Sequence, residues 1–373
     1  MMNSASQSDS MRGGDPETVG PEPNAALSPQ CPECDARVGI ADRFCEACGR
    51  ELGARRIALP WSDPDARPTC EGCGGTSYDA DGYCRGCGQL RPEPDRFEAD
   101  LGAVYVATDR GIAHARNEDA VAAAVVEHVD KRPIATVVAV SDGVSTSQDP
   151  QAASGAAARA GVDACLTALA EARSGTAVVM AGLTAAAQAV RDIAVHDGHA
   201  PSCTYVSAIV RGYDGDGVEI TVVNVGDSRA YWLRSDGIEP IVGGNAPSRR
   251  LSVDDSWAQA LVDAGAMDEE SAMRDPRAHT LLRWLGADSE DRPWSDRCVQ
   301  TFHTTGPGVL LLCSDGLWNY VSDPAELARM VNGVPRAQAA RGLIEFALRS
   351  GGSDNITVAL VPIGPSVDAG EAQ

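Results

Sequence analysis

The chain has 373 residues, with 53 acidic against 31 basic side chains and a formal net charge of −22. This length predicts more than one folded unit. The acidic residues are spread along the chain and no run of Lys or Arg occurs, which argues against binding to nucleic acids or anionic membranes through phosphate contacts.

The sequence favours a cytoplasmic protein. No apolar run approaches the roughly 18 residues of a transmembrane helix. The first eight residues lack the basic segment and apolar core that are typical of a signal peptide. Twelve cysteines are present, but eight of them have a spacing that fits metal binding better than disulfides.

Composition divides the chain into six segments. Ser, Pro, Gly and acidic residues dominate the start, which holds too little apolar surface to fold. A short Pro-rich linker separates the cysteine-rich part from a larger domain. In order, we expect disordered residues 1–30, zinc ribbons at 31–49 and 70–88, a linker at 91–98, a catalytic domain at 99–363 and a flexible tail at 364–373.

The cysteine-rich part holds two copies of one pattern, C-x2-C-x10-C-x2-C. The ligands would be Cys31, Cys34, Cys45 and Cys48 in the first copy and Cys70, Cys73, Cys84 and Cys87 in the second. Each C-x2-C turn points two sulfurs at one centre, so each copy predicts one closed, structural Zn²⁺ site. The copies resemble zinc ribbons of the double-ribbon type. A disulfide framework is the alternative, which a reducing compartment would disfavour.

Strands and helices are both expected in the larger domain. The strand-like runs are 104–108, 120–126, 134–140, 205–210, 219–224, 230–233, 309–313 and 356–361. The helical stretches are 152–171, 177–195, 254–264, 323–331 and 335–349. Strands follow strands and helices come in pairs, which predicts an α+β fold of antiparallel sheets covered by helices.

Aspartates stand at the ends of several apolar runs. Asp142 and Asp315 each come one serine after such a run, and Asp354 lies just before another. A carboxylate beside a core needs a partner, and Lys131 is the chain's single lysine. Several converging carboxylates form a site for hard divalent cations, which take oxygen ligands.

The larger domain resembles the metal-dependent Ser/Thr protein phosphatases of the PPM or type 2C family, bacterial type, from about Gly102 to Ile363. Six motifs in the order and spacing of the family carry the resemblance. They are Asp109-Arg-Gly111 with Asn117-Glu-Asp119, Asp142-Gly143, Pro201-Ser-Cys-Thr204, Asn224-Val-Gly-Asp-Ser-Arg-Ala230, Leu311-Leu-Cys-Ser-Asp-Gly-Leu317 and Gly352-Ser-Asp-Asn-Ile-Thr357. The fold implied is an α-β-β-α sandwich of two antiparallel sheets, here preceded by two zinc ribbons.

The resemblance implies roles for particular residues. Asp142 would bridge two Mg²⁺ or Mn²⁺ ions, with the carbonyl of Gly143 beside it. Asp315 and Asp354 would bind one of these ions, and Asp119 would bind metal or orient a water. Asp227 corresponds to the position of a third, weaker metal in bacterial relatives, although a plain turn with Arg229 as the partner of Asp227 is the alternative.

The sequence departs from the family pattern at two places. The arginine that usually binds the substrate phosphate is replaced by His114, and Arg116 stands two residues later. Positions two apart share a face in an extended segment, so we expect Arg116 to be the phosphate clamp and His114 to be secondary. The stretch after Gly143 reads Val144-Ser-Thr-Ser147 in place of a Met-Gly-Gly-like sequence.

The leading hypothesis is a protein serine/threonine phosphatase that uses a metal-activated water on phosphoserine and phosphothreonine. Its partners would be phosphoprotein substrates of a Ser/Thr kinase, with docking through the ribbons. The alternative is a pseudophosphatase that binds phosphorylated or regulatory partners without turnover.

Overall fold

The computed structural model describes residues 47–48, 54–60, 73–77, 83–88, 95–127, 132–193, 200–212, 217–234, 247–289, 294–295 and 297–364. The segment predicted to be disordered, residues 1–30, lies outside this part of the chain, as does the tail after residue 364. Most of the two predicted ribbons also lies outside it.

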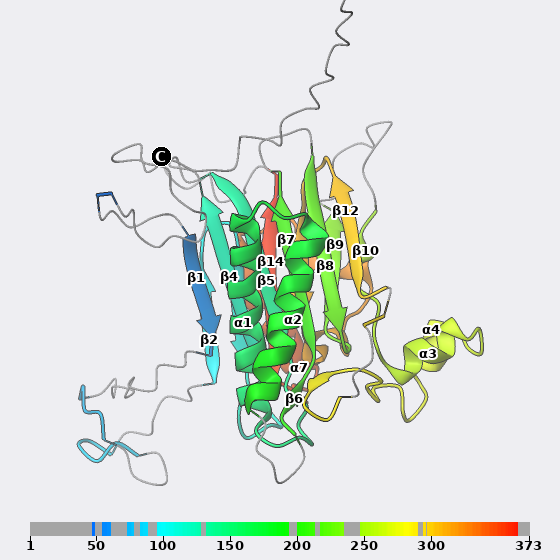
Figure 1. Cartoon of the computed structure of the whole chain (residues 1–373). Helices are drawn as coiled ribbons and strands as arrows, with labels where there is room; N and C mark the ends of the chain where they lie inside the picture. Colours follow the sequence, from blue (N-terminus) through cyan, green and yellow to red (C-terminus); the bar gives the residue numbers. More distant parts are fainter. Residues whose placement is uncertain are drawn as a thin grey trace, which may run out of the picture.

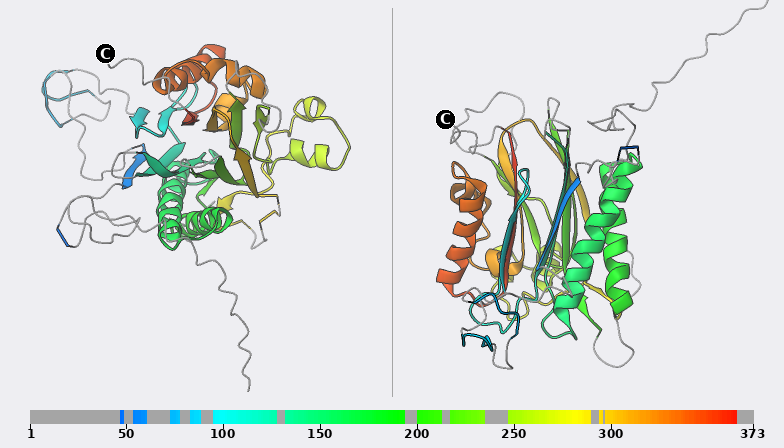
Figure 2. Two further views of the ribbon diagram at one scale, coloured as in Figure 1. Left: turned by 90° about the horizontal axis from the view of Figure 1, so that it is seen from above. Right: turned by 90° about the vertical axis from the view of Figure 1, so that its left-hand side faces the viewer.

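Two antiparallel sheets of six strands each lie face to face between layers of helices, as the α+β prediction expected (Figures 1 and 2). The first sheet has the order β1 (Ala54–Leu59), β4 (Ala120–Glu127), β5 (Pro133–Ser141), β7 (Tyr205–Arg211), β8 (Val218–Val225) and β12 (Val299–Thr304). The second has the order β10 (Arg249–Arg250), β9 (Arg229–Arg234), β13 (Gly308–Cys313), β14 (Ile356–Ile363), β3 (Tyr105–Asp109) and β2 (Arg96–Asp100).

The central strands are buried on both faces, which explains why they read as continuous apolar runs. All but one of the residues of β4 are buried, because helices cover one face and the second sheet covers the other. A layer of Val, Ala, Leu and aromatic side chains fills the space between the sheets, where the rings of Trp232 and Phe302 lie 5.7 Å apart. This double-sided burial holds the ends of the central strands in fixed positions.

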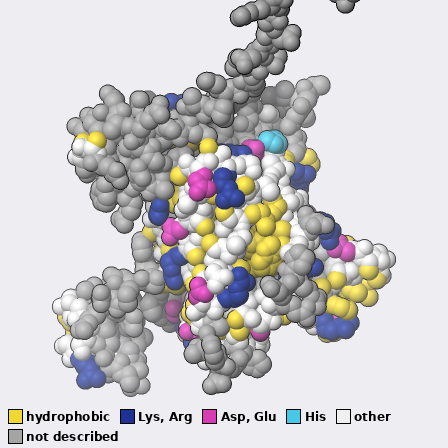
Figure 3. Space-filling view, viewed as in Figure 1, with side chains coloured by type: hydrophobic (Ala, Val, Ile, Leu, Met, Phe, Trp, Pro, Cys, Tyr) yellow, Lys and Arg dark blue, Asp and Glu magenta, His cyan; other side chains and the backbone are white. Residues whose placement is uncertain are grey.

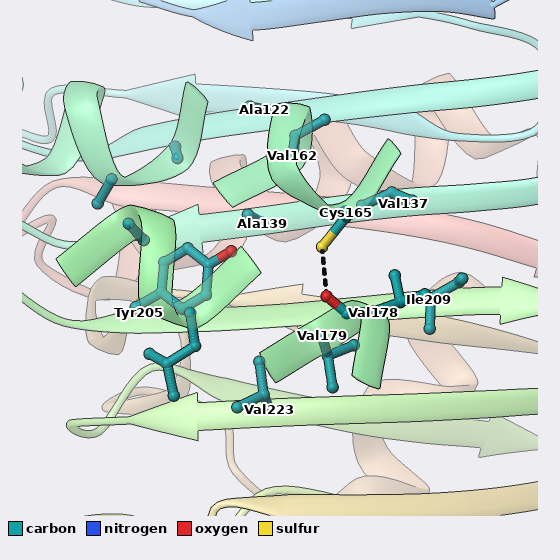
Figure 4. Packing of buried hydrophobic residues seen from close by; sticks show 14 of the residues in the cluster. Ala122, Val137, Ala139, Val162, Cys165, Val178, Val179, Tyr205, Ile209 and Val223 are labelled. Carbon is teal, nitrogen blue, oxygen red and sulfur yellow. Dashed lines mark hydrogen bonds between the residues drawn. The ribbon is translucent and has the colours of Figure 1, made fainter. Parts of the chain in front are cut away.

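Helices α1 (Pro150–Ala170) and α2 (Gly175–Ile193) cover the first sheet (Figure 2). They approach it closely because small residues face the sheet: a Cβ on Gly161 would lie 2.1 Å from the hydroxyl oxygen of Tyr205. The Cys165 thiol donates to the carbonyl of Val178 at 3.4 Å between the two helices (Figure 4). Burial raises the pKa of this thiol to about 12, so it is a packed, unreactive group.

Helices α6 (Pro324–Val331) and α7 (Arg336–Ser350) cover the second sheet, together with the single turn α5 (Asp315–Trp318). Asp323 caps the N-terminus of α6, because its side chain accepts a hydrogen bond from the backbone N–H of Glu326 at 2.8 Å. Two short helices, α3 (Trp257–Asp263) and α4 (Glu269–Ala272), form a lobe that projects from the side of the sandwich (Figure 1). Strands β6 (Ser202–Cys203) and β11 (Leu285–Gly286) pair as a separate two-stranded sheet.

The sheets begin earlier in the chain than the predicted domain start at residue 99. Strand β2 starts at Arg96, inside the predicted linker, and pairs with β3. Strand β1, which lies between the two cysteine patterns, pairs with β4 over its whole length. Residues Ala54–Leu59, between the predicted ribbons, are therefore part of the sandwich.

Among the described residues, no helix is both long and apolar enough to cross a membrane. On the face that carries α1 and α2, basic and acidic side chains are interspersed (Figure 3). The described side chains on this face therefore form no continuous basic strip for a nucleic-acid backbone to follow.

Candidate metal centre

Five predicted site aspartates converge at one end of the two sheets. In the first sheet, Ala120 of β4 pairs with Ser141 of β5, which brings the preceding Asp119 next to the following Asp142. In the second sheet, Arg229 of β9 pairs with Cys313 of β13, so Asp227 and Asp315 lie two residues beyond this pair on neighbouring strands. Asp354 precedes the adjacent strand β14. Antiparallel pairing therefore brings together carboxylates that are far apart in the sequence.

Hydrogen bonds join the two sheets at this end. Ser314 donates to Asp119 Oδ2 at 2.7 Å and accepts from the backbone N–H of Thr357 at 3.0 Å. The side-chain oxygen of Asn355 accepts from the backbone N–H of Glu118 at 2.7 Å. These bonds fix the position of the carboxylates across the gap between the sheets.

The Asn355 amide also donates to two backbone carbonyls of the first-motif loop, Arg110 at 2.7 Å and Arg116 at 3.1 Å. Sequence reasoning did not single out Ser314 and Asn355 as contributors to the site. Their signal is position: each is adjacent to a predicted site aspartate at the end of an apolar strand.

Close backbone contacts require glycine beside two of the aspartates. A Cβ on Gly143 would lie 2.7 Å from the carbonyl oxygens of Glu118 and Pro150. A Cβ on Gly316 would lie 1.9 Å from the carbonyl oxygen of Asn355. The Asp-Gly pairs are thus packing requirements of the site and not only turn signals.

Among the described residues, too few cationic side chains lie near the aspartates to neutralise their charges. Asp119 is 1% exposed, and its Oδ1 and that of Asp315 are buried without a hydrogen-bond partner. Arg229 forms its ion pair with Asp254, at 2.6 Å, although its charge also lowers the pKa of Asp227. Among the described residues, no ion pair joins Arg229 to Asp227, so the structure does not favour the alternative in which Arg229 is the partner of Asp227.

The shared burial of these groups disfavours their charged forms. Burial, with repulsion from Asp354 and Asp315, raises the pKa of Asp119 to about 7. Burial and the neighbouring carboxylates raise the pKa values of Asp142 and Asp227 well above the ordinary range, and that of Asp315 to about 6. Such a cluster is stable in the charged state only with cations between its members.

Residues from the two segments that depart from the family pattern both contact the carboxylate of Glu118. Arg116 Nε lies 3.1 Å from Glu118 Oε1, and Ser145, from the divergent Val144–Ser147 stretch, donates to Glu118 Oε2 at 2.7 Å. Glu118 is thus held by Ser145 and orients Arg116. The Arg116 side chain is 56% exposed.

His114 is placed differently from Arg116. Its Nε2 lies 3.2 Å from Oδ1 of Asp354, one of the converging carboxylates. His114 therefore lies beside a predicted metal ligand, whereas Arg116 contacts Glu118, the residue before Asp119.

Part of the second cysteine pattern is described. The sulfurs of Cys73, Cys84 and Cys87 lie within 4.8 Å of one another, and Cys73 Sγ is 3.5 Å from Cys84 Sγ. The predicted fourth ligand, Cys70, lies outside the described residues. So do Cys31, Cys34 and Cys45 of the first pattern, where only Cys48 is described.

The carboxylate cluster has the donors of a site for hard divalent cations. Its acidic oxygens lie at the ends of rigid, buried strands and include two buried oxygens without hydrogen-bond partners in the described structure. Sites rich in carboxylate oxygens suit Mg²⁺ or Mn²⁺. The fold and the carboxylate site are those that the resemblance to the metal-dependent phosphatases implies.

Comparison with known proteins agrees with this class. The serine/threonine phosphatase stp of Listeria innocua is 34% identical over 263 residues, which cover 68% of this chain and 93% of that protein. The serine/threonine protein phosphatase PstP of Mycobacterium tuberculosis is 30% identical over 268 residues, covering 71% of this chain and 46% of that protein. No family model matches the chain.

Solved structures give the same result. The PPM Ser-Thr phosphatase MsPP of Mycobacterium smegmatis superposes with a TM-score of 0.52 at 25% identity, over 71% of this chain and all of that chain. The PstP/Ppp structure from M. tuberculosis has a TM-score of 0.52 at 26% identity, over 70% of this chain and 98% of that chain. The chain belongs to the PPM family of metal-dependent serine/threonine protein phosphatases.

Proposed function

We propose that the chain hydrolyses phosphoserine and phosphothreonine in proteins at the carboxylate cluster. The observation that carries the proposal is the convergence of five aspartates, with two buried oxygens unpartnered in the described structure, in a chain of this family. Asp142 and the Gly143 carbonyl would hold two Mg²⁺ or Mn²⁺ ions, with Asp315, Asp354 and Asp119 as further ligands and Asp227 at a third, weaker site.

Ions bound there would lower the pKa of a water molecule and neutralise the phosphoryl oxygens during in-line attack. The protein's own contribution is to fix the donors. Asp119 is held by Ser314, and the loop that carries Glu118 is held by Asn355. Held in this way, the donors need little rearrangement when the substrate binds.

Turnover of a phosphopeptide tests the proposal. We expect the full-length chain to release phosphate from a phosphothreonine peptide with added Mn²⁺, and not without it. A folded protein that binds the peptide but releases no phosphate would instead support the pseudophosphatase alternative, to which the replacement of the usual arginine by His114 points.

Arg116 is proposed to bind the substrate phosphate. A guanidinium makes charge-assisted hydrogen bonds to phosphate at any physiological pH, and Glu118 orients it here. Arg116→Ala should lower kcat/KM by roughly ten- to a hundredfold, which corresponds to about 1.5–3 kcal/mol. Steady-state kinetics on a phosphopeptide measures this loss.

His114→Ala is the matched control for Arg116→Ala. We expect it to change KM less, because His114 contacts Asp354. The KM of the wild type should also stay nearly flat between about pH 6 and 8, where an ordinary histidine would lose its charge. A wild-type-like Arg116 variant beside a His114 variant that loses substrate affinity would reverse these roles.

The cysteine patterns are proposed to bind two structural Zn²⁺ ions, one per ribbon. The grouping of Cys73, Cys84 and Cys87 supports the second site. Four protein ligands leave no open position, so these sites would not take part in the reaction. Reduced thiolates of this kind favour the cytoplasm, where the ribbons would dock the phosphoprotein substrates of a Ser/Thr kinase.

A further inference from the structure

A histidine from the projecting lobe reaches the carboxylate cluster. One ring nitrogen of His279, on the segment after α4, lies with carboxylate oxygens of Asp227 and Asp315 so that all three atoms are within 4.8 Å of one another. Two ligands on opposite sides of an ion, at about 2.1 Å each, are about 4.2 Å apart. The three groups therefore need only a small adjustment to bind one cation.

The backbone around His279 is held on both sides. The N–H of Trp257 donates to the carbonyl of Thr280 at 2.9 Å, and the N–H of Ala258 donates to that of Ala278 at 3.1 Å. The position of His279 is thus fixed by the start of α3 and is not that of an unsupported loop residue.

The ring of His279 is also held next to Asp227 by an aromatic neighbour. It stacks on Trp318, with ring centroids 5.6 Å apart and an angle of 23° between the planes. The indole N–H of Trp318 donates to the backbone carbonyl of Asp227 at 2.8 Å. One aromatic side chain therefore supports both the histidine and the loop that bears the carboxylate.

Two observations beyond the proximity of the three groups indicate a cation. Oδ1 of Asp315 is buried with no hydrogen-bond partner in the described structure. Asp227 is 5% exposed, and the guanidinium of Arg229 forms its ion pair with Asp254. Asp227 is buried and Asp315 is partly buried, so two charged carboxylates at this place are costly unless an ion binds between them.

We infer that His279 supplies a nitrogen ligand to the cation at Asp227 and Asp315. The inference rests on the proposed function, which assigns a third, weaker metal to Asp227. Imidazole is a poor ligand for Mg²⁺ compared with the later divalent metals, so this position favours Mn²⁺ over Mg²⁺. The cation would also tie the α3–α4 lobe to the end of the sheets.

Pulsed electron paramagnetic resonance of Mn²⁺ bound to the full-length, tag-free chain tests the assignment. Nitrogen-14 modulation from a directly bound imidazole is expected in the wild type and should be lost in His279→Ala. His114→Ala is the control, since His114 lies beside Asp354; it should keep the modulation. Loss of the signal in His114→Ala, or its persistence in His279→Ala, would overturn the inference.

Equilibrium binding of Mn²⁺ gives a second readout. The weakest site is expected to lose about tenfold or more in affinity in His279→Ala, while the tighter sites keep theirs. Equal affinities in the two proteins would mean that His279 only stacks on Trp318. Neither measurement depends on turnover, so a wild type that binds Mn²⁺ through nitrogen yet releases no phosphate would reject the proposed function and leave this inference intact.

Discussion

Asp142→Asn is expected to lower kcat/KM on a phosphopeptide by about a thousandfold with Mn²⁺ present, because the metal ions stabilise the transition state by several kcal/mol. Asp315→Asn should have a similar effect. Asp142 follows β5 and Asp315 follows β13, so each change removes a proposed metal ligand supplied by a different sheet. An amide keeps the shape of the carboxylate but not its charge. Initial rates across a Mn²⁺ titration measure the loss and show whether excess metal restores activity.

The Asp142→Asn substitution should also stabilise the protein when no metal is bound. In the metal-free fold the pKa of Asp119 is raised to about 7 and that of Asp315 to about 6, from an ordinary value of 3.8. Between the ordinary and the raised values the folded chain binds more protons than the unfolded chain, so the free energy of unfolding falls as the pH rises through this window. The substitution removes one of the repelling charges, and the metal-free variant should melt above the wild type at pH 7.

Two comparisons separate this effect from a general change in stability. Mn²⁺ should raise the Tm of the wild type more than that of Asp142→Asn. Asp163→Asn is the matched control, because Asp163 is 61% exposed and pairs with Arg56 at the surface; its activity and Tm should match the wild type. Near wild-type turnover by either site variant would show that the reaction takes place elsewhere.

The strand-end aspartates could be predicted because the strands that carry them are clear in the sequence as apolar runs. Strands buried on both faces read as unbroken apolar runs, so the position of Asp142 and Asp315 just after such runs was visible in the sequence. Antiparallel sheets bring the end of one strand next to the start of its neighbour. Which aspartates become neighbours depends on the strand order, however, and the family resemblance supplied that information.

The partners of the site residues were not predictable in the same way. Arg229 binds Asp254, and His279 approaches Asp227, because the lobe between β10 and β11 folds back onto the ends of the sheets. Nothing in the local pattern around residue 279 distinguishes it from an exposed loop histidine. Contacts between segments this far apart are set by tertiary packing.

All four edge strands of the two sheets, β1, β2, β10 and β12, escaped prediction for a related physical reason. Strand β2 alternates between exposed and half-buried residues, and β12 has two buried residues of six. Strand β1 contains Arg55 and Arg56, whose side chains extend to Glu127 and Asp163. A strand with one neighbour buries less surface, so its sequence need not be apolar.

The position of β1 leads to the last prediction, which concerns a chain that begins at Asp95. This shortened chain lacks both cysteine patterns and also β1, so the edge of the Ala- and Val-rich strand β4 becomes exposed. We expect its Tm to fall by roughly 5–15 °C, because Leu59 is 1% exposed in the full chain and the loss of such a buried side chain costs about 2–5 kcal/mol. It should also aggregate more readily through the open edge.

A chain that begins at Glu51 is the matched control, since it removes the first cysteine pattern but keeps β1. Its Tm should stay close to that of the full chain, and Leu59→Ala in the full chain should reproduce part of the loss. Phosphopeptide turnover by the folded fraction should persist in both shortened chains, because β4 and its neighbours still carry the aspartates. Equal melting temperatures for the chains that start at Asp95 and Glu51 would mean that β1 does not stabilise the sandwich. The cysteine-rich segment would then make no stabilising contact with the sandwich.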